Sequence, residues 1–140
     1  MAISSSRFAV AVHTLAVLGF LQKRGVERAS SQMLAKSVNT NPVVIRHLLS
    51  ALKKAGLVVS KEGKEGGASL AKSAAKISLA EIFAAVEENG ILSPNKNPEL
   101  KSCPVSCGMK RVLPSIFKEV DKAVVKTLKG KTLQQVIDQV

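Results

Sequence analysis

The sequence predicts a mainly α-helical protein with one small β-hairpin, and three observations carry that prediction. Apolar residues recur at helical spacing along most of the 140-residue chain. A short helix, a turn and a second helix with a basic outer face are predicted in succession between residues 30 and 56. Two short strand-like runs then flank a glycine-rich segment, 62–67. Hydrophobic residues make up 46% of the sequence, which is enough for a core and argues against disorder.

The first helix is predicted from about Arg7 to Lys23. Residues 4–6 are serines that can cap it, and Gly25 follows its end. Its middle is apolar on nearly every side, which indicates burial between other elements. His13 lies in this stretch, and we interpret it as a core or interface histidine with a satisfied ring nitrogen, with a ligand role as the alternative.

The second helix is short, over residues 32–37, and Ser30 or Ser31 is its predicted N-cap. Three side chains are expected to face inward: Met33, Leu34 and Val38. Residues 39–42, Asn-Thr-Asn-Pro, then supply a turn, an N-cap and a proline for the first position of the next helix. This order predicts a helix-turn-helix.

The third helix is predicted from about Pro42 to Ala55, with Gly56 after its end. One apolar stripe is expected to face the core: Ile45, Leu48, Leu52 and Ala55. A second stripe is expected to face outward: Val43, Arg46, His47, Ser50 and Lys54. An ordinary surface helix has such a face too. The evidence for DNA binding therefore comes from the turn before this helix and the basic hairpin after it.

A hairpin is predicted after the third helix. Its strands lie at 57–61 and 68–71, and the loop between them holds three glycines, which accept positive φ angles. A helix-turn-helix followed by a basic hairpin is the arrangement of a winged helix-turn-helix. In such a protein the second helix enters the major groove of DNA and the hairpin, or wing, lies beside it.

The C-terminal half is predicted to hold a helix over 79–88, capped by Ser78, and a long helix over about 108–129. An irregular connection, 91–107, separates them and contains both cysteines of the chain. A short helix capped by Thr132 follows. We therefore divide the chain into a winged helix-turn-helix DNA-binding domain, a cysteine-containing loop, and a dimerisation helix with a short terminal helix, at residues 1–90, 91–107 and 108–140.

The net charge of +11 favours a polyanionic partner. Residues 1–80 hold 12 Lys and Arg against 3 Asp and Glu, whereas residues 81–140 hold 9 against 7. No acidic residue lies between Glu27 and Glu62. The positive charge is therefore concentrated on the helix-turn-helix segment, where DNA phosphates would bind.

The aromatic composition favours duplex over single-stranded nucleic acid. The chain has no Trp and no Tyr, and its four Phe lie at core-like positions in helices. A stacking platform for single-stranded bases needs exposed aromatic rings. Double-stranded DNA is therefore the predicted partner.

The predicted DNA-binding residues have distinct roles. We expect Thr40 and Asn41 to reach base edges or phosphate, and Arg46 to form a bidentate pair with guanine. Val43 is suited to a thymine methyl group, and His47 to phosphate or to solvent. The lysines are expected to bind phosphate, with mobile surface charge as the alternative for those of the wing. The full set is Ser31, Lys36, Asn39, Thr40, Asn41, Pro42, Val43, Arg46, His47, Lys53, Lys54, Lys61 and Lys64.

Five motifs extend the pattern over nearly the whole chain. They are SRFAVAVH at 6–13, SVNTNPVVIR at 37–46, LKKAGLV at 52–58, GKEGGASLA at 63–71 and ISLAEIFAAVE at 77–87. This ordered set resembles the Rrf2 family of bacterial winged-helix transcription regulators. The resemblance implies a homodimer built on the long C-terminal helix, which binds a pseudo-palindromic operator as a repressor.

The long helix supports a dimer from its own sequence. Its apolar stripe is longer than a small monomer needs to cover, with packing against its own domain as the alternative. The stripe comprises Met109, Val112, Leu113, Ile116, Val120, Ala123, Val124 and Leu128. Pro114 either kinks this helix or marks its start.

Cys103 and Cys107 are the only cysteines of the chain. The resemblance bears on them, because cluster-containing members of the family hold their iron–sulfur cluster with three cysteines in this loop. A complete cluster here would need a non-cysteine ligand or ligands shared across the dimer, so we expect no iron–sulfur cluster, no other metal and no other cofactor. A thiol switch through oxidation of the pair is the sharper hypothesis, and two loop thiols without a regulatory role are the alternative.

Two other function classes are alternatives to a DNA-binding regulator. A small thiol oxidoreductase would use Cys103 and Cys107, but their spacing is not CxxC and no carboxylate pair or phosphate-binding loop accompanies them. A winged-helix protein-interaction module has no need of an unbroken positive face. We therefore expect a regulator, not an enzyme, that responds to a redox or small-molecule signal; the effector is unknown.

No secretory signal or membrane-length apolar run is evident, which indicates a cytoplasmic protein without a membrane partner.

Overall fold

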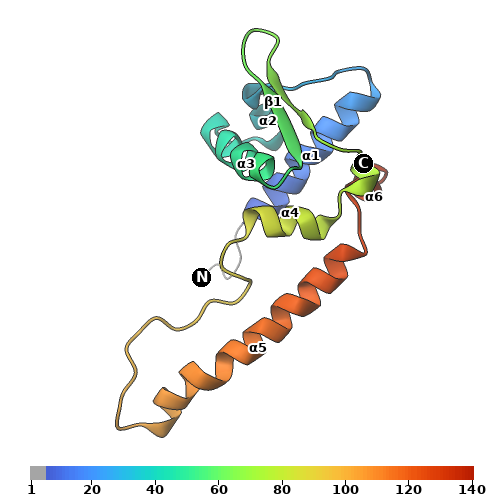
Figure 1. Cartoon of the computed structure of the whole chain (residues 1–140). Coiled ribbons are helices and arrows are strands. Elements are labelled where there is room, and N and C mark those ends of the chain that lie inside the picture. The colour runs from blue at the N-terminus through green and yellow to red at the C-terminus, as the bar shows by residue number, and fades with distance from the viewer. Residues whose placement is uncertain (1–5) are drawn as a thin grey trace.

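One long helix projects from a head of short helices and a hairpin in the computed structural model, which describes residues 6–140 (Figure 1). In chain order the elements are α1 (Arg7–Lys23), α2 (Ser31–Val38), α3 (Pro42–Lys54), β1 (Val58–Lys61), β2 (Gly67–Leu70), a 3-10 turn η1 (Ala74–Lys76), α4 (Leu79–Val86), α5 (Pro104–Lys129) and α6 (Leu133–Ile137). The predicted fold class, mainly α with a small hairpin and a long C-terminal helix, is confirmed. Residues 4 and 5 of the predicted serine cap lie outside the described residues, and Ser6 makes no side-chain capping hydrogen bond.

α1 is the central helix of the head, and α2, α3, α4, α6 and β2 all contact it. Its inner face buries Ala11, Leu15 and Leu18. The inner face of α3 buries Ile45, Leu48 and Leu52. Each such leucine or isoleucine stabilises the fold by roughly 1.5–3 kcal/mol through its burial. The predicted core stripe of the third helix is confirmed at these three positions, whereas Ala55 is exposed because it is the C-cap.

The turn between α2 and α3 follows the predicted chemistry. The Ser30 hydroxyl accepts a hydrogen bond from the Met33 amide at 3.1 Å and begins α2. Asn39 ends α2 in the left-handed conformation, with φ of 64°. The Asn41 side-chain oxygen then accepts a hydrogen bond from the Val43 amide at 2.8 Å. The start of α3 is therefore fixed by capping residues of its own sequence.

The hairpin pairs β1 with β2 in antiparallel register, beginning with Val58 opposite Leu70. The segment before α2 joins the other edge of β2, because the amides and carbonyls of Ala29 and Ala68 exchange hydrogen bonds of 3.0 and 2.8 Å. Gly67 has φ of +142°, and a Cβ there would lie 2.6 Å from the Ala29 carbonyl oxygen. Only glycine therefore fits at this position, and the base of the hairpin is fixed to the head.

The long helix α5 begins at Pro104 rather than at about residue 108. Cys103 is its N-cap, and proline is favoured at the first helical position. The irregular connection therefore ends at residue 103, and Cys107 belongs to the helix. Pro114 lies inside α5 and does not mark its start. No residue of α5 is fully buried in this chain. Among residues 6–140, no helix is both long and apolar enough to cross a bilayer.

The chain returns to the head after α5, and α6 packs against α1 (Figure 1). Leu133 is fully buried, Ile137 is 7% exposed, and the Leu133 amide donates to the Ile77 carbonyl at 2.9 Å. α6 thus packs through Leu133 and Ile137 into the core of the head, whereas the predicted division grouped it with the long helix. A five-residue helix is too short for apolar periodicity to indicate what it packs against.

Two side chains lie differently from the prediction because α1 and α2 each keep an open side. Met33 of α2 is 47% exposed, although Leu34 beside it is buried as expected. His13 of α1 is exposed, and its Nε2 lies 3.1 Å from the Ser37 hydroxyl. The ring nitrogen is satisfied as expected, but not in the core.

α4 begins with a capping box, in which the Ser78 hydroxyl accepts from the Glu81 amide and the Glu81 carboxylate accepts from the Ser78 amide. Lys72 donates to the same carboxylate at 2.6 Å, and this hydrogen bond chiefly lowers the pKa of Glu81 from its ordinary 4.5. Because the folded-state pKa is depressed, this stabilisation is present above pH 4.5 and is lost as the pH falls through the folded-state pKa.

Leu133→Ala should lower the free energy of unfolding by about 2–5 kcal/mol, because it leaves a cavity in the core of the head. Val140→Ala is the control, since Val140 is 88% exposed. It should change stability by no more than about 0.5 kcal/mol. Urea unfolding at one fixed protein concentration measures both. Equal, small changes would show that α6 is not part of the core.

Candidate nucleic-acid interface

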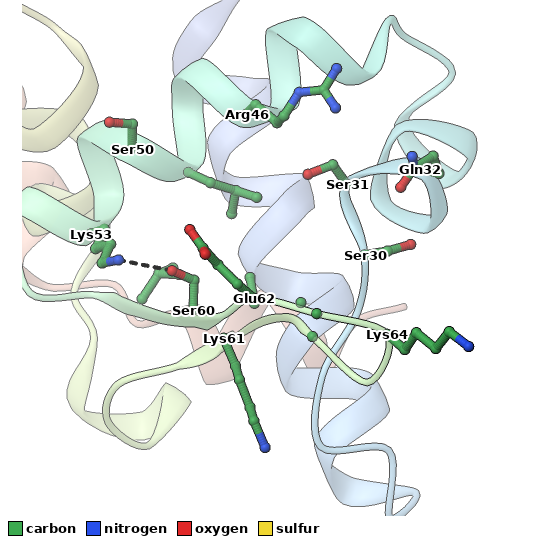
Figure 2. A pocket seen from close by; sticks show the side chains of 16 residues that line it. Ser30, Ser31, Gln32, Arg46, Ser50, Lys53, Ser60, Lys61, Glu62 and Lys64 are labelled. Carbon is green, nitrogen blue, oxygen red and sulfur yellow. Dashed lines mark hydrogen bonds between the residues drawn. The ribbon is translucent and has the colours of Figure 1, made fainter.

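A basic groove lies between α3, the start of α2 and the hairpin, and has a volume of about 680 Å³ (Figure 2). Its charged lining comprises four cations and one carboxylate: Arg46, Lys53, Lys61, Lys64 and Glu62. Its uncharged polar lining comprises Ser30, Ser31, Gln32, Ser50 and Ser60. A concave surface with an excess of cations concentrates positive potential and suits a polyanion.

α3 presents the outward face that the sequence predicts. Because the opposite face is buried against the head, the helical period turns Val43, Arg46 and His47 to solvent, and Val43 is 47% exposed. Ser50 and Lys54 continue this face and are exposed too. The helix therefore offers a row of accessible side chains next to the basic groove, as base contacts require.

The cations of the basic groove have no acidic partner among residues 6–140. Carboxylates pair with cations elsewhere in the chain, Glu27 with Arg28 and Glu81 with Lys72. Lys53 donates a hydrogen bond of 2.9 Å to the Ser60 hydroxyl, which connects α3 to β1 (Figure 2). Cations that no carboxylate neutralises keep their charge available for phosphate.

The structure separates the predicted DNA-binding residues into groups. Ser31, Arg46, Lys53, Lys61 and Lys64 line the basic groove. Lys36, Asn39, Thr40 and Pro42 line a second hollow, of about 620 Å³, at the turn between α2 and α3. Val43, His47 and Lys54 lie on the open surface of α3. The side-chain oxygen of Asn41 accepts the capping hydrogen bond of α3, and its amide nitrogen can still donate to DNA.

The basic groove also contains residues that the sequence did not single out as DNA contacts: Ser30, Gln32, Ser50, Ser60 and Glu62. The sequence indicates Ser30 only as an N-cap of α2, so it gives no sign that this residue lines the groove. Glu62 is the acidic residue that ends the acid-free run, so the sequence pattern of positive charge excludes it from the predicted site. Only the fold shows that this carboxylate lies among the cations.

The apolar stripe predicted on α5 divides into two faces. Leu113, Val120, Val124 and Leu128 are half-buried within this chain. Four large apolar side chains are exposed: Val105 at 66%, Met109 at 41%, Val112 at 42% and Ile116 at 45%. They follow one another at intervals of four, three and four residues, which places them on one face of the helix. We call these four residues the α5 stripe.

Comparison with known proteins identifies the family of the chain. A model of the Rrf2 family, described as iron-dependent transcriptional regulators, matches residues 4–139. This chain belongs to the Rrf2 family. YwnA of Bacillus subtilis (strain 168), a candidate HTH-type transcriptional regulator, is 39% identical over 135 residues, which cover 96% of each protein.

Solved structures similar to this Rrf2 protein agree with the assignment. A candidate DNA-binding protein of known crystal structure is 38% identical, with a TM-score of 0.71 over 94% of this chain and 99% of that one. CymR, the global cysteine regulator of B. subtilis, is 23% identical, with a TM-score of 0.69 over 100% of this chain and 99% of its own, and shows the same fold. The protein is thus a DNA-binding transcription regulator and not an enzyme, as predicted.

The donor atoms of this Rrf2 chain do not fit an iron–sulfur cluster. Such clusters are held by four protein ligands, mostly cysteine thiolates. The chain has two cysteines, and within residues 6–140 no three His, Cys, Asp or Glu side chains gather as a metal site. One chain therefore lacks the ligands for a cluster.

Both thiols lie at the N-terminal end of α5, half-buried and not joined to each other. The Cys103 sulfur accepts a hydrogen bond from the Ser106 amide at 3.4 Å. The Cys107 thiol lies 3.7 and 3.8 Å from the carbonyl oxygens of Leu100 and Lys101, to which it donates. The pair therefore joins the end of the connecting loop to the first turn of α5.

Arg46→Ala should relax sequence preference, because an arginine paired with guanine contributes about 1–3 kcal/mol of discrimination. Lys64→Ala should instead weaken binding to all duplexes alike, because a lysine on the wing binds phosphate. Affinities for an operator selected from random duplexes, and for its single-base variants, measure both effects. An equal loss on every duplex for Arg46→Ala would remove this residue from base contacts.

Proposed function

We propose that this Rrf2 protein is a cytoplasmic, homodimeric repressor that binds a pseudo-palindromic operator without an iron–sulfur cluster and responds to oxidation of its thiols. The observation that best supports DNA binding is the basic groove beside the exposed face of α3. The α5 stripe supports the dimer, and the position of Cys103 and Cys107 supports the signal. These parts rest on different residues and are tested separately.

In this proposal α3 lies in the major groove, with Arg46 and Val43 toward base edges. Lys61 and Lys64 of the hairpin point away from α3 and bind phosphates beside it (Figure 2). Lys36, at the second hollow, binds a phosphate near the turn between α2 and α3. Base contacts thus come from one helix, and the cations around it set its position on the duplex.

The α5 stripe supports a second copy of this chain as its occupant. Four large apolar side chains exposed on one face of a 26-residue helix form a patch of the kind that marks an interface. A homodimer formed through one such face has a two-fold axis. Two heads related in this way meet two half-sites of opposite orientation, which is why the operator is expected to be pseudo-palindromic.

Ile116→Lys should weaken the dimer about tenfold or more, because it removes apolar area and places a charge in the interface. Ser115→Lys introduces the same side chain at the adjacent, exposed position outside the α5 stripe and is the control. Sedimentation equilibrium measures both dissociation constants. Similar dissociation constants for the two variants would show that the stripe is not the dimer contact.

Oxidation of the two thiols would change the start of α5. Hydrogen peroxide takes two electrons and two protons from the thiols, which gives one disulfide and two water molecules. Helix positions four apart have Cβ atoms about 5–6 Å apart, whereas a disulfide needs about 3.5–4.5 Å. The new bond would therefore distort the first turn of α5, where Val105 of the α5 stripe lies. The heads of the dimer would then no longer match the half-site spacing.

Peroxide should lower the operator affinity of the wild type by about 5- to 150-fold, the usual range of coupling between two sites. Dithiothreitol should restore it. Cys103→Ser should bind equally well with and without peroxide, whereas Ser102→Ala, which keeps both thiols, should respond as the wild type does. Equal affinities of the oxidised and reduced wild type would exclude the thiol switch.

A small-molecule signal is the second candidate, favoured by a cavity between the connecting loop and α5. Its volume is about 310 Å³, at the lower end of the range for ligand sites. Pro98, Leu113 and Phe117 give it apolar walls, and Asn97 and Lys110 add polar groups. A ligand bound there would act on the same end of α5 as the thiols.

A further inference from the structure

Glu62 is the one carboxylate among the residues that line the basic groove. Figure 2 shows its side chain directed toward α3, on the side where Ser50 and Lys53 lie, whereas Lys61 and Lys64 point away from that helix. Its neighbours in the groove include the Lys53 ammonium and the Ser60 hydroxyl. The carboxylate therefore faces the side of the groove from which bases would be contacted.

Glu62 is not engaged within the protein. Within residues 6–140 its side chain forms no ion pair and no hydrogen bond, unlike those of Glu27 and Glu81, which pair with cations. A carboxylate that served only to neutralise Arg46 or Lys53 would lie within ion-pair distance of one of them. Its acceptor oxygens are instead free for a donor that comes from outside.

The backbone holds Glu62 close to α3. It directly follows Lys61, the last residue of β1, which pairs with Gly67. The Gly66 amide donates to the Gly63 carbonyl at 3.0 Å, and a Cβ on Gly66 would collide with the Lys61 carbonyl oxygen. The turn is thus closed tightly at its base, so Glu62 does not share the freedom of the wing tip.

The chemistry of a carboxylate restricts what it can contact on a duplex. An ionised carboxylate only accepts hydrogen bonds, so phosphates, guanine N7 and O6, and thymine O4 all repel it. The donors in the major groove are the amino groups of cytosine and adenine. Adenine presents its N7 acceptor beside the amino group, whereas cytosine presents no acceptor there. Cytosine is therefore the base edge that fits a lone carboxylate.

We propose that Glu62 is a specificity-determining residue, which accepts a hydrogen bond from a cytosine amino group next to the guanine contacted by Arg46. The inference rests on the proposed docking of α3 in the major groove and deepens it. Arg46 and Glu62 together then recognise a guanine and a cytosine from opposite sides of one groove. The carboxylate also disfavours every duplex that offers phosphate or a base acceptor at this position, so it raises selectivity at the expense of affinity.

Glu62→Gln tests this, because it removes the charge and keeps the shape. Glu65→Gln is the matched control, since Glu65 lies on the same wing and loses the same charge but does not line the groove. The operator is first selected from random duplexes with wild-type protein. Affinities are then measured for the operator, for each of its single-base variants and for an unrelated duplex.

At one cytosine of each half-site, Glu62→Gln should reduce the preference over the other bases by about 5- to 150-fold, while preferences elsewhere persist. Its affinity for the unrelated duplex should rise. Glu65→Gln should leave every base preference unchanged. If Glu62→Gln raises affinity for all duplexes by one common factor, Glu62 acts only through its charge and the proposal is wrong. A wild type without any base preference would instead contradict the proposed docking itself.

Discussion

Burial of the inner face of α3 is the constraint on which the DNA-binding surface depends. Ile45, Leu48 and Leu52 pack into the core of the head and fix both the position and the rotation of the helix. Because an α-helix has 3.6 residues per turn, burial of this face determines that Arg46 and Val43 are exposed. Close packing allows little rotation, so the outward side chains keep their directions before DNA is bound.

A second constraint is that the chain leaves the head and returns to it. The connecting loop runs out to the far end of α5, and α5 leads back to α6 in the core (Figure 1). The Asp121 carboxylate of α5 accepts a hydrogen bond from the Ile91 amide at 3.0 Å, and a Cβ on Gly90 would lie 2.7 Å from that carboxylate. The C-terminal half of α5 is therefore held at the head. A distortion at Cys103 would act at the opposite, N-terminal end of this helix.

Local signals made most of the head predictable. Ser30 and Asn41 are capping residues whose chemistry acts within three positions along the chain, and the apolar stripe of α3 needs no tertiary information. The place of α6 depends on a contact with α1, more than a hundred residues earlier, which no local pattern contains. Likewise, periodicity indicates an apolar face on α5 but not that Leu113 is half-buried while Ile116 is exposed. Glu62 joins the candidate site only because the hairpin folds back beside α3.

The central claim is that the cations of the basic groove bind duplex phosphates while α3 contacts bases. Its most direct test is the operator affinity of the reduced wild type as a function of salt concentration. If about six to ten phosphates are bound, the affinity should fall roughly 10³- to 10⁵-fold between about 50 and 200 mM salt, with a linear dependence of log affinity on log salt. An affinity that changes by less than about threefold over this range would contradict the account, because it would leave the basic groove without bound phosphate.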